Sequence, residues 1–474
     1  MLGVTVQGMM KTDLNMAMVC MLNHTESVES TNDSNRDTCP ARNSSTNEQD
    51  SEKINGKLHW SSQAQAWIFA SFYWGGLVSV LLCSNLVQKF GAARVLLIGT
   101  ILNVVGSWVT PVAAQHGGVA FLIVVRFVMG LGQGVLLPTA ATVIAAWFPA
   151  FEKSTASAIY TAGNQISTIL SLFVSSQLCQ IDFLGGWPSI FYLYGAFGAI
   201  FCVLWLIVIN DSPAESRFIS EEEKSYILEG RKGVEKRVKA PWRRILTSSV
   251  IWAMVLCTAA QSIITVSLTT YLPRYLKFVL RMNLTSNGIW SALPFICQLF
   301  SKFVMAAIAD AVKRRYKGSL NIVTKFFNSI ASFGAAACVI GVTFVSCDEQ
   351  AIAVMLFAGA MAILSGYIPG YFTSLLSVAP AHTAAVNSLT RVFGQIASIA
   401  SPYIIGFITV QNTMSEWRIV FFVIAGALIV SGTFFLIFGS AEPLPWAVRA
   451  PASSISTDSV STWTTQSNEK KEIC

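Results

Sequence analysis

The chain has 474 residues, of which 53% are hydrophobic and only 12% are charged, with a formal net charge of +7. This composition excludes an ordinary soluble domain, which would expose large apolar patches and aggregate. The positive charge does not indicate nucleic-acid binding, because the basic residues collect in particular loops between apolar segments.

Predominantly apolar stretches of about 20 or more residues recur along the whole chain, and each could cross about 30 Å of hydrocarbon. Strands are excluded because unpaired backbone groups cannot face lipid. We therefore expect an all-α membrane protein with about twelve transmembrane helices in two six-helix halves. The expected helices lie near 1–22, 63–87, 95–114, 119–147, 155–178, 187–209, 250–276, 287–309, 321–346, 351–378, 384–410 and 417–439.

The first expected helix carries two charged residues, Lys11 and Asp13, in its middle. They argue against a cleaved signal peptide, which would also have a basic start and a small-residue cleavage site. Asp13 lies on the other flank of the helix from Lys11. Two interpretations of Asp13 stay open: an ion pair with a basic neighbour, or a role in proton coupling.

The polar segment 23–59 is rich in Ser, Thr, Asn, Asp and Glu, so we expect a largely disordered, glycosylated outer loop. Basic residues occupy alternate loops, which places those loops and both termini in the cytosol. The same topology puts four glycosylation sequons outside, at Asn23, Asn32, Asn43 and Asn283. Glycosylation indicates the secretory route, and both the plasma membrane and a lysosomal or vesicular membrane stay open.

The second expected helix contains Tyr73 and Trp74. Either ring could line a substrate cavity, although aromatic residues in membrane helices are more often packing residues. We keep Tyr73 as a candidate substrate-binding residue.

The fourth expected helix carries Arg126 in the middle of an apolar run. A charge at the bilayer centre costs about 2.5–3.5 kcal/mol on insertion scales, so such an arginine usually faces a protein-lined cavity. Gln133 follows two turns later on the same face, about 10 Å along the axis. A buried cation and amide on one face suit a small anion; the alternative is an arginine satisfied by backbone carbonyls between helices. Three glycines, Gly130, Gly132 and Gly134, let a neighbouring helix pack closely.

The long charged segment 211–249 divides the apolar segments into six and six. We therefore expect an N-terminal half over 1–210, a cytosolic central loop over 211–249 and a C-terminal half over 250–440. Residues 441–474 are expected to form a disordered cytosolic tail.

The ten cysteines are scattered, without the spacing of a metal site or a disulfide framework. Three that the topology puts outside, Cys39, Cys179 and Cys347, could pair. No Ser/His/Asp set, phosphate loop or metal cluster is visible, so the sequence does not indicate an enzyme, a metal site or a bound cofactor.

Several short motifs, in order and at matching spacing, give a more specific result. The chain resembles the anion:cation symporter family of the major facilitator superfamily, which includes sialin, vesicular glutamate transporters and sodium–phosphate cotransporters. The resemblance covers nearly the whole chain, from about Lys11 to Trp446. It is carried by Leu14–Val19, Ser71–Gly75, Lys89–Gly91, Arg126–Pro138, Trp147–Pro149, Glu152–Lys153, Gly186–Tyr192, Tyr271–Pro273, Ala309–Asp310 and Glu416–Arg418.

The resemblance implies a site on two helices. The family's helix-1 arginine falls on Lys11, which keeps the charge but lacks the planar fork. Its helix-4 arginine falls on Arg126, and the acid two turns later falls on Gln133, which cannot titrate. We expect Lys11 and Arg126 to form the cationic substrate site, with no acid at the family's position to neutralise them. The helix-7 arginine and helix-2 histidine of the glutamate transporters would fall near Ser262 and Phe69, which argues against vesicular glutamate specificity.

These observations predict a secondary active transporter that moves small organic or inorganic anions, similar to sialic acid, phosphate, urate or glutamate, by alternating access. Sodium ions or protons are candidate co-transported ions, and with glutamine at position 133 we expect weak pH dependence. The expected partners are the anionic substrate and the bilayer, and the protein is expected to be a monomer. The alternative is a transport-impaired membrane sensor or scaffold, suggested by departures from the family at Ser84, Asn85, Gln133 and Ser377.

Overall fold

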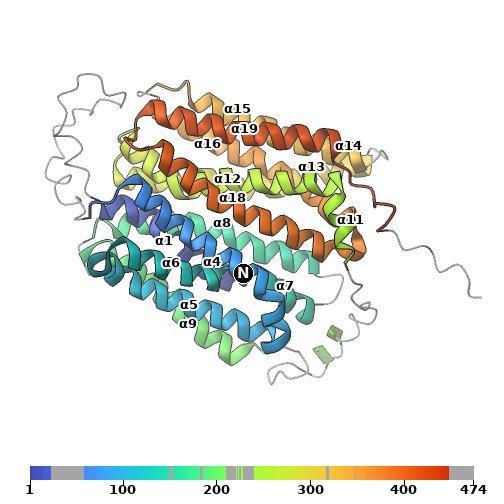
Figure 1. Cartoon of the computed structure of the whole chain (residues 1–474), viewed down its shortest axis with the longest axis horizontal. Helices are drawn as coiled ribbons and strands as arrows, with labels where there is room; N and C mark the ends of the chain where they lie inside the picture. Colours follow the sequence, from blue (N-terminus) through green and yellow to red (C-terminus); the bar gives the residue numbers. More distant parts are fainter. Residues whose placement is uncertain are drawn as a thin grey trace, which may run out of the picture.

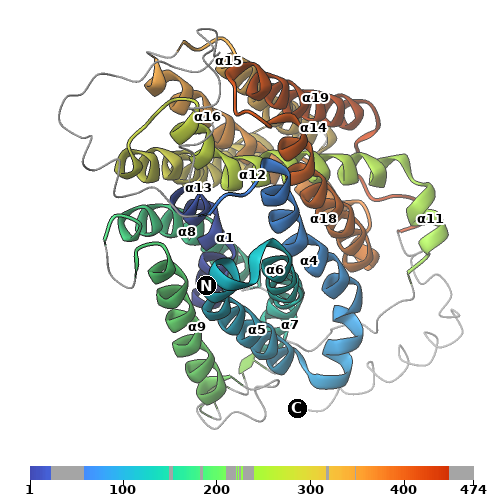
Figure 2. The same ribbon diagram turned by 60° about the vertical axis from the view of Figure 1, so that its left-hand side comes forward.

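The computed structural model describes residues 1–22, 58–148, 153–181, 185–209, 220, 222–223, 226–227, 240–315, 320–346 and 349–447. The sequons at Asn23, Asn32 and Asn43 and the end of the tail lie outside these residues. Within them the chain is almost entirely helical, apart from a bridge between Leu22 and Leu58. Two helical bundles lie side by side in Figures 1 and 2, the N-terminal one coloured blue to green and the C-terminal one yellow to red.

Six helical passes form each bundle. The N-terminal half contains α1 (Leu2–Met21), α4 (Ser62–Phe90), α5 (Ala92–Val112), α6 (Gly118–Gly134) continued by α7 (Leu136–Trp147), α8 (Lys153–Leu178) and α9 (Pro188–Val208). After the short α11 (Trp242–Thr247), the C-terminal half contains α12 (Ser249–Phe278), α13 (Leu284–Arg315), α14 (Leu320–Ser329) continued by α15 (Ala335–Val342), α16 (Gln350–Leu364) continued by α17 (Thr373–Ser377), α18 (Thr383–Ile408) and α19 (Met414–Phe438).

The described residues contain nine stretches that are long and apolar enough to cross a membrane. The stretch Ala92–Ile144, of 53 residues, holds two passes, because it contains α5, α6 and most of α7. The helices α1 and α8, of 20 and 26 residues, lie outside the nine and complete the twelve. The all-α, twelve-helix fold class expected from the sequence is confirmed.

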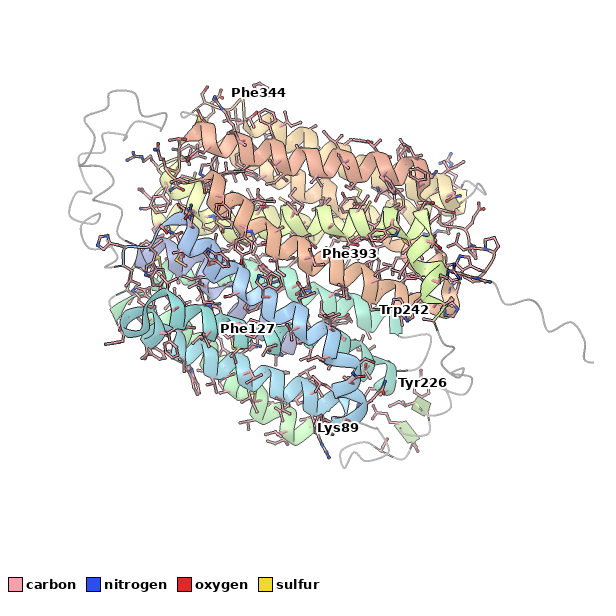
Figure 3. The ribbon with its side chains drawn as sticks, viewed as in Figure 1. Lys89, Phe127, Tyr226, Trp242, Phe344 and Phe393 are labelled. Atoms are coloured by element: carbon pink, nitrogen blue, oxygen red, sulfur yellow. A yellow bond between two sulfur atoms is a disulfide. The ribbon has the colours of Figure 1, made fainter. Side chains whose placement is uncertain are left out.

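The two ends of the bundle are named here after the topology that the basic loops predict. The outer end is the end where α1 and α8 finish and α4 begins, and the inner end is the opposite one. Figure 3 labels Lys89, Tyr226 and Trp242 at the inner end and Phe344 at the outer end.

Glycines bring α4, α5 and α6 into close contact, as expected from the sequence. A Cβ on Gly130 would lie 2.0 Å from the carbonyl oxygen of Phe72, and one on Gly132 would lie 2.3 Å from that of Gly99. A Cβ on Gly134 would lie 2.0 Å from Oγ of Ser79. No larger residue fits without moving a neighbouring helix, so these glycines set how closely the helices pack.

The two halves meet through pairs of helices, with α1 on α12, α4 on α18 and α8 on α13. Close approaches occur near the outer end, where Gly288 of α13 faces Ser176 of α8. Gly406 of α18 likewise faces Ala66 of α4. The outer end is therefore tightly packed between the halves.

A disulfide joins Cys20, in the last turn of α1, to Cys179, directly after α8. The sequence predicted that Cys179 could pair with Cys39 or Cys347, and this partner choice was wrong. Cys20 lies at the outer end because α1 finishes one residue later, at Met21. Cys39 and Cys347 lie outside the described residues.

We expect Cys20→Ser to lower the stability of the folded protein by about 2–4 kcal/mol, since the disulfide closes a long loop in the unfolded chain. The sequence separation of 159 residues puts it among long loops. The thermal unfolding temperature of detergent-purified protein measures the effect. Cys297→Ser, which removes a free, half-buried cysteine of α13, is the matched control. Equal unfolding temperatures for the two variants would contradict the prediction.

Candidate functional site

Lys11 differs from its neighbours on α1 in its exposure. From Val4 to Leu22 every residue is buried except Lys11, which is partly exposed. Its ammonium group lies over the ring of Tyr73 of α4, 5.3 Å from the ring centre. No described carboxylate forms an ion pair with it. The structure thus brings two sequence-predicted site residues together, with the lysine facing away from the interior of its own half.

Polar contacts connect this point to the C-terminal half. The hydroxyl of Tyr73 lies close to Thr270 of α12. One turn above Lys11 on α1, the side-chain amide of Asn15 donates to the carbonyl oxygen of Thr269, at 3.0 Å. Lys11 and Tyr73 therefore lie between the two halves, which is where transporters built from two repeats hold substrate.

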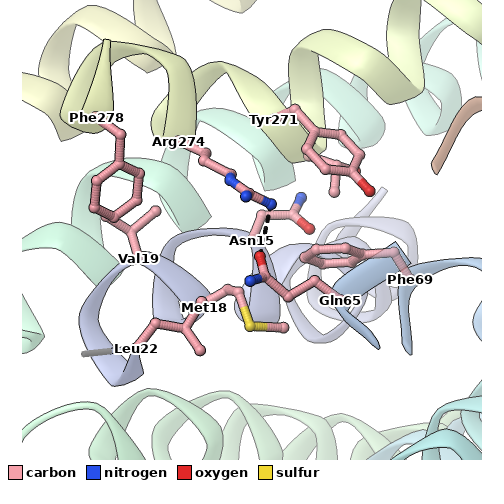
Figure 4. Close-up of a pocket in the computed structure, with 10 residues that line it drawn as sticks. Asn15, Met18, Val19, Leu22, Gln65, Phe69, Tyr271, Arg274 and Phe278 are labelled. Atoms are coloured by element: carbon pink, nitrogen blue, oxygen red, sulfur yellow. Dashed lines mark hydrogen bonds between the residues drawn. The ribbon is translucent and has the colours of Figure 1, made fainter. Parts of the chain in front are cut away.

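Contacts between α12 and α4 close the space between Lys11 and the outer end, and Figure 4 shows one of them, between Arg274 and Gln65. Arg274 of α12 donates to Gln65 and Ser62 of α4, each at 2.7 Å. A cavity of about 10 Å³ remains beside them, which holds about one water. A ligand cannot pass from the outer end to Lys11 in this conformation.

Burial along α12 changes between the two ends. Every residue from Val266 to Leu276 is buried, whereas Thr258, Gln261 and Ser262 in the inner half are partly exposed. These three residues are polar, so their exposure fits a wet passage between the halves rather than lipid. With the outer end closed, this polar inner half of α12 is the side from which a ligand would reach Lys11.

Two more cations lie along the inner half. Arg391 of α18 lies in electrostatic range of Tyr160, on α8 of the opposite half, and of Tyr371. Lys302 of α13 is partly exposed and lies about 160° around the helix from the lipid-exposed Phe300. Neither cation has an ion-pair partner among the described carboxylates.

Arg126 is neutralised by Asp13 of α1, although the family's acidic position on its own helix is Gln133. Its Nη2 donates to Oδ1 of Asp13 at 2.9 Å, and both side chains are buried. Asp13 also accepts from Ser107 of α5 at 3.2 Å, and the guanidinium lies 5.9 Å from the ring centre of Phe191 of α9. The pair is thus inside the N-terminal half.

Helical geometry explains why Lys11 and Arg126 separate. Asp13 follows Lys11 by two residues, which places the two side chains about 200° apart on α1. One face of α1 therefore presents Lys11 to the other half, while the opposite face binds Arg126. Of the two interpretations of Asp13, the ion pair matches the observed contact. A direct contact between Arg126 and substrate stays a prediction.

The remaining candidates are placed as follows. Gln133 is partly buried on the Arg126 face of α6, and its Oε1 has no hydrogen-bond partner among the described residues. Trp74 is 45% exposed and donates to the hydroxyl of Tyr403 at 3.3 Å, so it packs between α4 and α18. Asn283 is exposed between α12 and α13, at the outer end.

Sequence reasoning missed Arg274 and Arg391. Both stand inside apolar segments, which is the same signal that identified Arg126. Each lies nearer to a helix end, where a long basic side chain ordinarily reaches the membrane surface. With Lys11 on α1, they place three cations where the two halves meet, and this arrangement suits a small anion.

Comparisons with known proteins give a consistent result. A family model described as Major Facilitator Superfamily matches residues 51–402. The "Putative inorganic phosphate cotransporter" of Drosophila melanogaster is 32% identical over 94% of this chain and 84% of that protein. The mouse "Sodium-dependent phosphate transport protein 3" is 30% identical over 92% of this chain and 91% of that protein. Among solved structures, a D-xylose–proton symporter superposes with a TM-score of 0.66 at 14% identity, covering 93% of this chain and 98% of that one.

Proposed function

Because this chain belongs to the anion:cation symporter family of the major facilitator superfamily, we propose that it binds its substrate at Lys11. It is a multi-pass secondary transporter of small anions rather than an enzyme. The observation that carries the proposal is the partial exposure of Lys11 within the otherwise buried stretch Val4–Leu22, without an acidic partner among the described residues. A cation in a region of low dielectric binds an anion more strongly than one in water.

The substrate reaches this site by alternating access. The contacts of Arg274 with Gln65 and Ser62 close the outer end, and the polar inner half of α12 is partly exposed. The described conformation is therefore the one that exchanges substrate with the cytosol. Arg391 and Lys302 would attract an anion along this inner passage before Lys11 binds it.

Which ion drives transport depends on whether an acidic group at membrane depth can gain and lose a proton. Gln133 cannot exchange a proton in the working pH range. Asp13 is tied to Arg126 by an ion pair and to Ser107 by a hydrogen bond. We therefore favour co-transport of sodium, the membrane potential or anion exchange over a proton gradient.

The outer end faces the extracellular space or the lumen of a lysosome-like vesicle, and the termini are cytosolic. Two observations support this orientation. The Cys20–Cys179 disulfide lies at the outer end, and disulfides form in oxidising compartments. The exposed sequon at Asn283 lies at the same end. The protein acts as a monomer.

Transport by purified protein in liposomes tests the proposal. Labelled phosphate, sialic acid, urate and glutamate are offered in turn with a sodium gradient, a membrane potential, a pH gradient or internal anion. We expect at least one anion to accumulate, with sodium, potential or exchange more effective than a pH gradient. Failure of all four anions under every gradient would reject transport by this protein. Accumulation driven only by a pH gradient would reject the driving ions favoured here.

A further inference from the structure

Arg274 is a buried cation between the two halves. It belongs to α12, is 4% exposed and lines the small cavity at the outer end (Figure 4). Its Nη1 donates to Oε1 of Gln65, and its Nη2 donates to Oγ of Ser62, both at 2.7 Å. Both acceptors are neutral oxygens of α4, so the positive charge is not balanced by either of them.

The carboxylate of Glu416, which lies in electrostatic range of Arg274, already accepts hydrogen bonds from other groups. Glu416 of α19 lies in electrostatic range of Arg274 without forming an ion pair with it. Its two oxygens accept from the backbone N–H groups of Gln411 and Thr413, completing the capping box of α19. Arg274 therefore carries a charge that the closed conformation leaves without a counter-ion.

The guanidinium also has unused binding capacity. Its Nε is buried and has no hydrogen-bond partner among the described residues. A buried charge of this kind is costly unless it is paired and fully hydrogen bonded. An anion in the adjoining space would relieve the cost, and the fork of N–H groups matches a carboxylate or phosphate.

Opening of the outer end would release this fork. Arg274 belongs to one half and both of its acceptors to the other, so separating the halves breaks both bonds together. The free guanidinium would then face the outer entrance. Lys11 lies one turn below Asn15, about 6 Å deeper along α1, and Asn15 lines the cavity with Arg274.

We propose that Arg274 is an outer anion-binding site, at which carboxylate- or phosphate-bearing substrate binds before it moves down to Lys11. Gln65 and Ser62 replace the anion on the guanidinium when the outer end closes. Occupancy of Arg274 and closure are therefore mutually exclusive. The inference rests on the proposed anion transport, because it assigns an entry site to that substrate.

Two variants with opposite expected effects test the site by uptake of labelled inorganic phosphate from the outer side. Gln65→Ala removes a closing contact but keeps the cation, so more protein faces outward and the external KM should fall about twofold. Arg274→Gln removes the cation, so the external KM should rise about tenfold or more. A purely structural contact would make the two variants change in the same direction. An external KM for Arg274→Gln at or below the wild-type value would overturn the proposal.

A second measurement does not depend on transport. Phe278 lines the same cavity one turn beyond Arg274 and is partly exposed. In a background with Cys39→Ser and Cys347→Ser, we measure how fast a membrane-impermeant thiol reagent labels Phe278→Cys. Inorganic phosphate should slow the labelling about threefold or more, and Arg274→Gln should abolish this protection.

The two measurements separate failure of the site from failure of the transport proposal. Protection that depends on Arg274, without uptake of phosphate, would support the site and reject phosphate as a transported substrate. Uptake of phosphate without protection that depends on Arg274 would reject the site and leave the transport proposal standing. Absence of both would reject Arg274 as an anion site.

Discussion

Asp13→Asn is expected to destabilise the folded protein by about 3–5 kcal/mol, because it leaves Arg126 buried without a counter-ion. The guanidinium is 2% exposed and binds Asp13 at 2.9 Å. An amide oxygen can still accept one hydrogen bond, but it does not balance the charge. Thermal unfolding of purified protein measures the loss, and we expect less folded protein in the membrane as well.

The charge-free double variant Asp13→Asn/Arg126→Gln is the matched comparison. It removes the unpaired charge together with its partner, so it should regain most of the stability lost in Asp13→Asn. Ser107→Ala removes only one hydrogen bond to the Asp13 carboxylate and should cost about 1.5–3 kcal/mol, less than Asp13→Asn. A stable Asp13→Asn variant that has lost pH-dependent transport would instead assign Asp13 to proton coupling and reject the structural pair.

Lys11→Gln is expected to lower kcat/KM for anion transport by about tenfold or more, while the protein still folds. A charge-assisted contact contributes about 1.5–3 kcal/mol, and glutamine is polar and only one bond shorter than lysine but carries no charge. Lys11→Arg keeps the charge and adds a planar fork, so its kcat/KM should stay within about threefold of the wild type. Initial uptake rates over a range of substrate concentrations measure both variants.

Lys325→Gln makes the same replacement on α14, a helix that packs on α19 within the C-terminal half. It controls for the loss of a lysine from a partly buried helical position. We expect its kcat/KM to match the wild type. If Lys11→Gln transported as well as Lys325→Gln, Lys11 would not be a substrate-binding residue.

Part of the candidate site could be predicted from the sequence of each helix taken alone. Tyr73 was a candidate because its ring could line a substrate cavity, and it does lie under Lys11. Arg126 was recognised as exceptional because a charge in an apolar run is costly. Its partner could not be identified, because Asp13 is 113 positions away and nothing in either helix indicates which neighbour it faces. The contacts of Arg274 could not be predicted for the same reason, since its acceptors are 209 and 212 positions away.

By itself, the sequence determined that lipid surrounds the chain and where the helices cross it. It also determined that α6 packs closely against neighbouring helices. Lipid requires each backbone group to be paired within its own segment, so length and apolar composition are enough to locate the helices. The glycines of α6 predicted close packing because a missing side chain has the same effect whichever helix approaches. Only the tertiary structure decided which cations are neutralised. The pairing of Arg126 with Asp13, the exposure of Lys11 and the closure by Arg274 depend on how the helices are rotated against one another, and that rotation results from packing across the whole bundle.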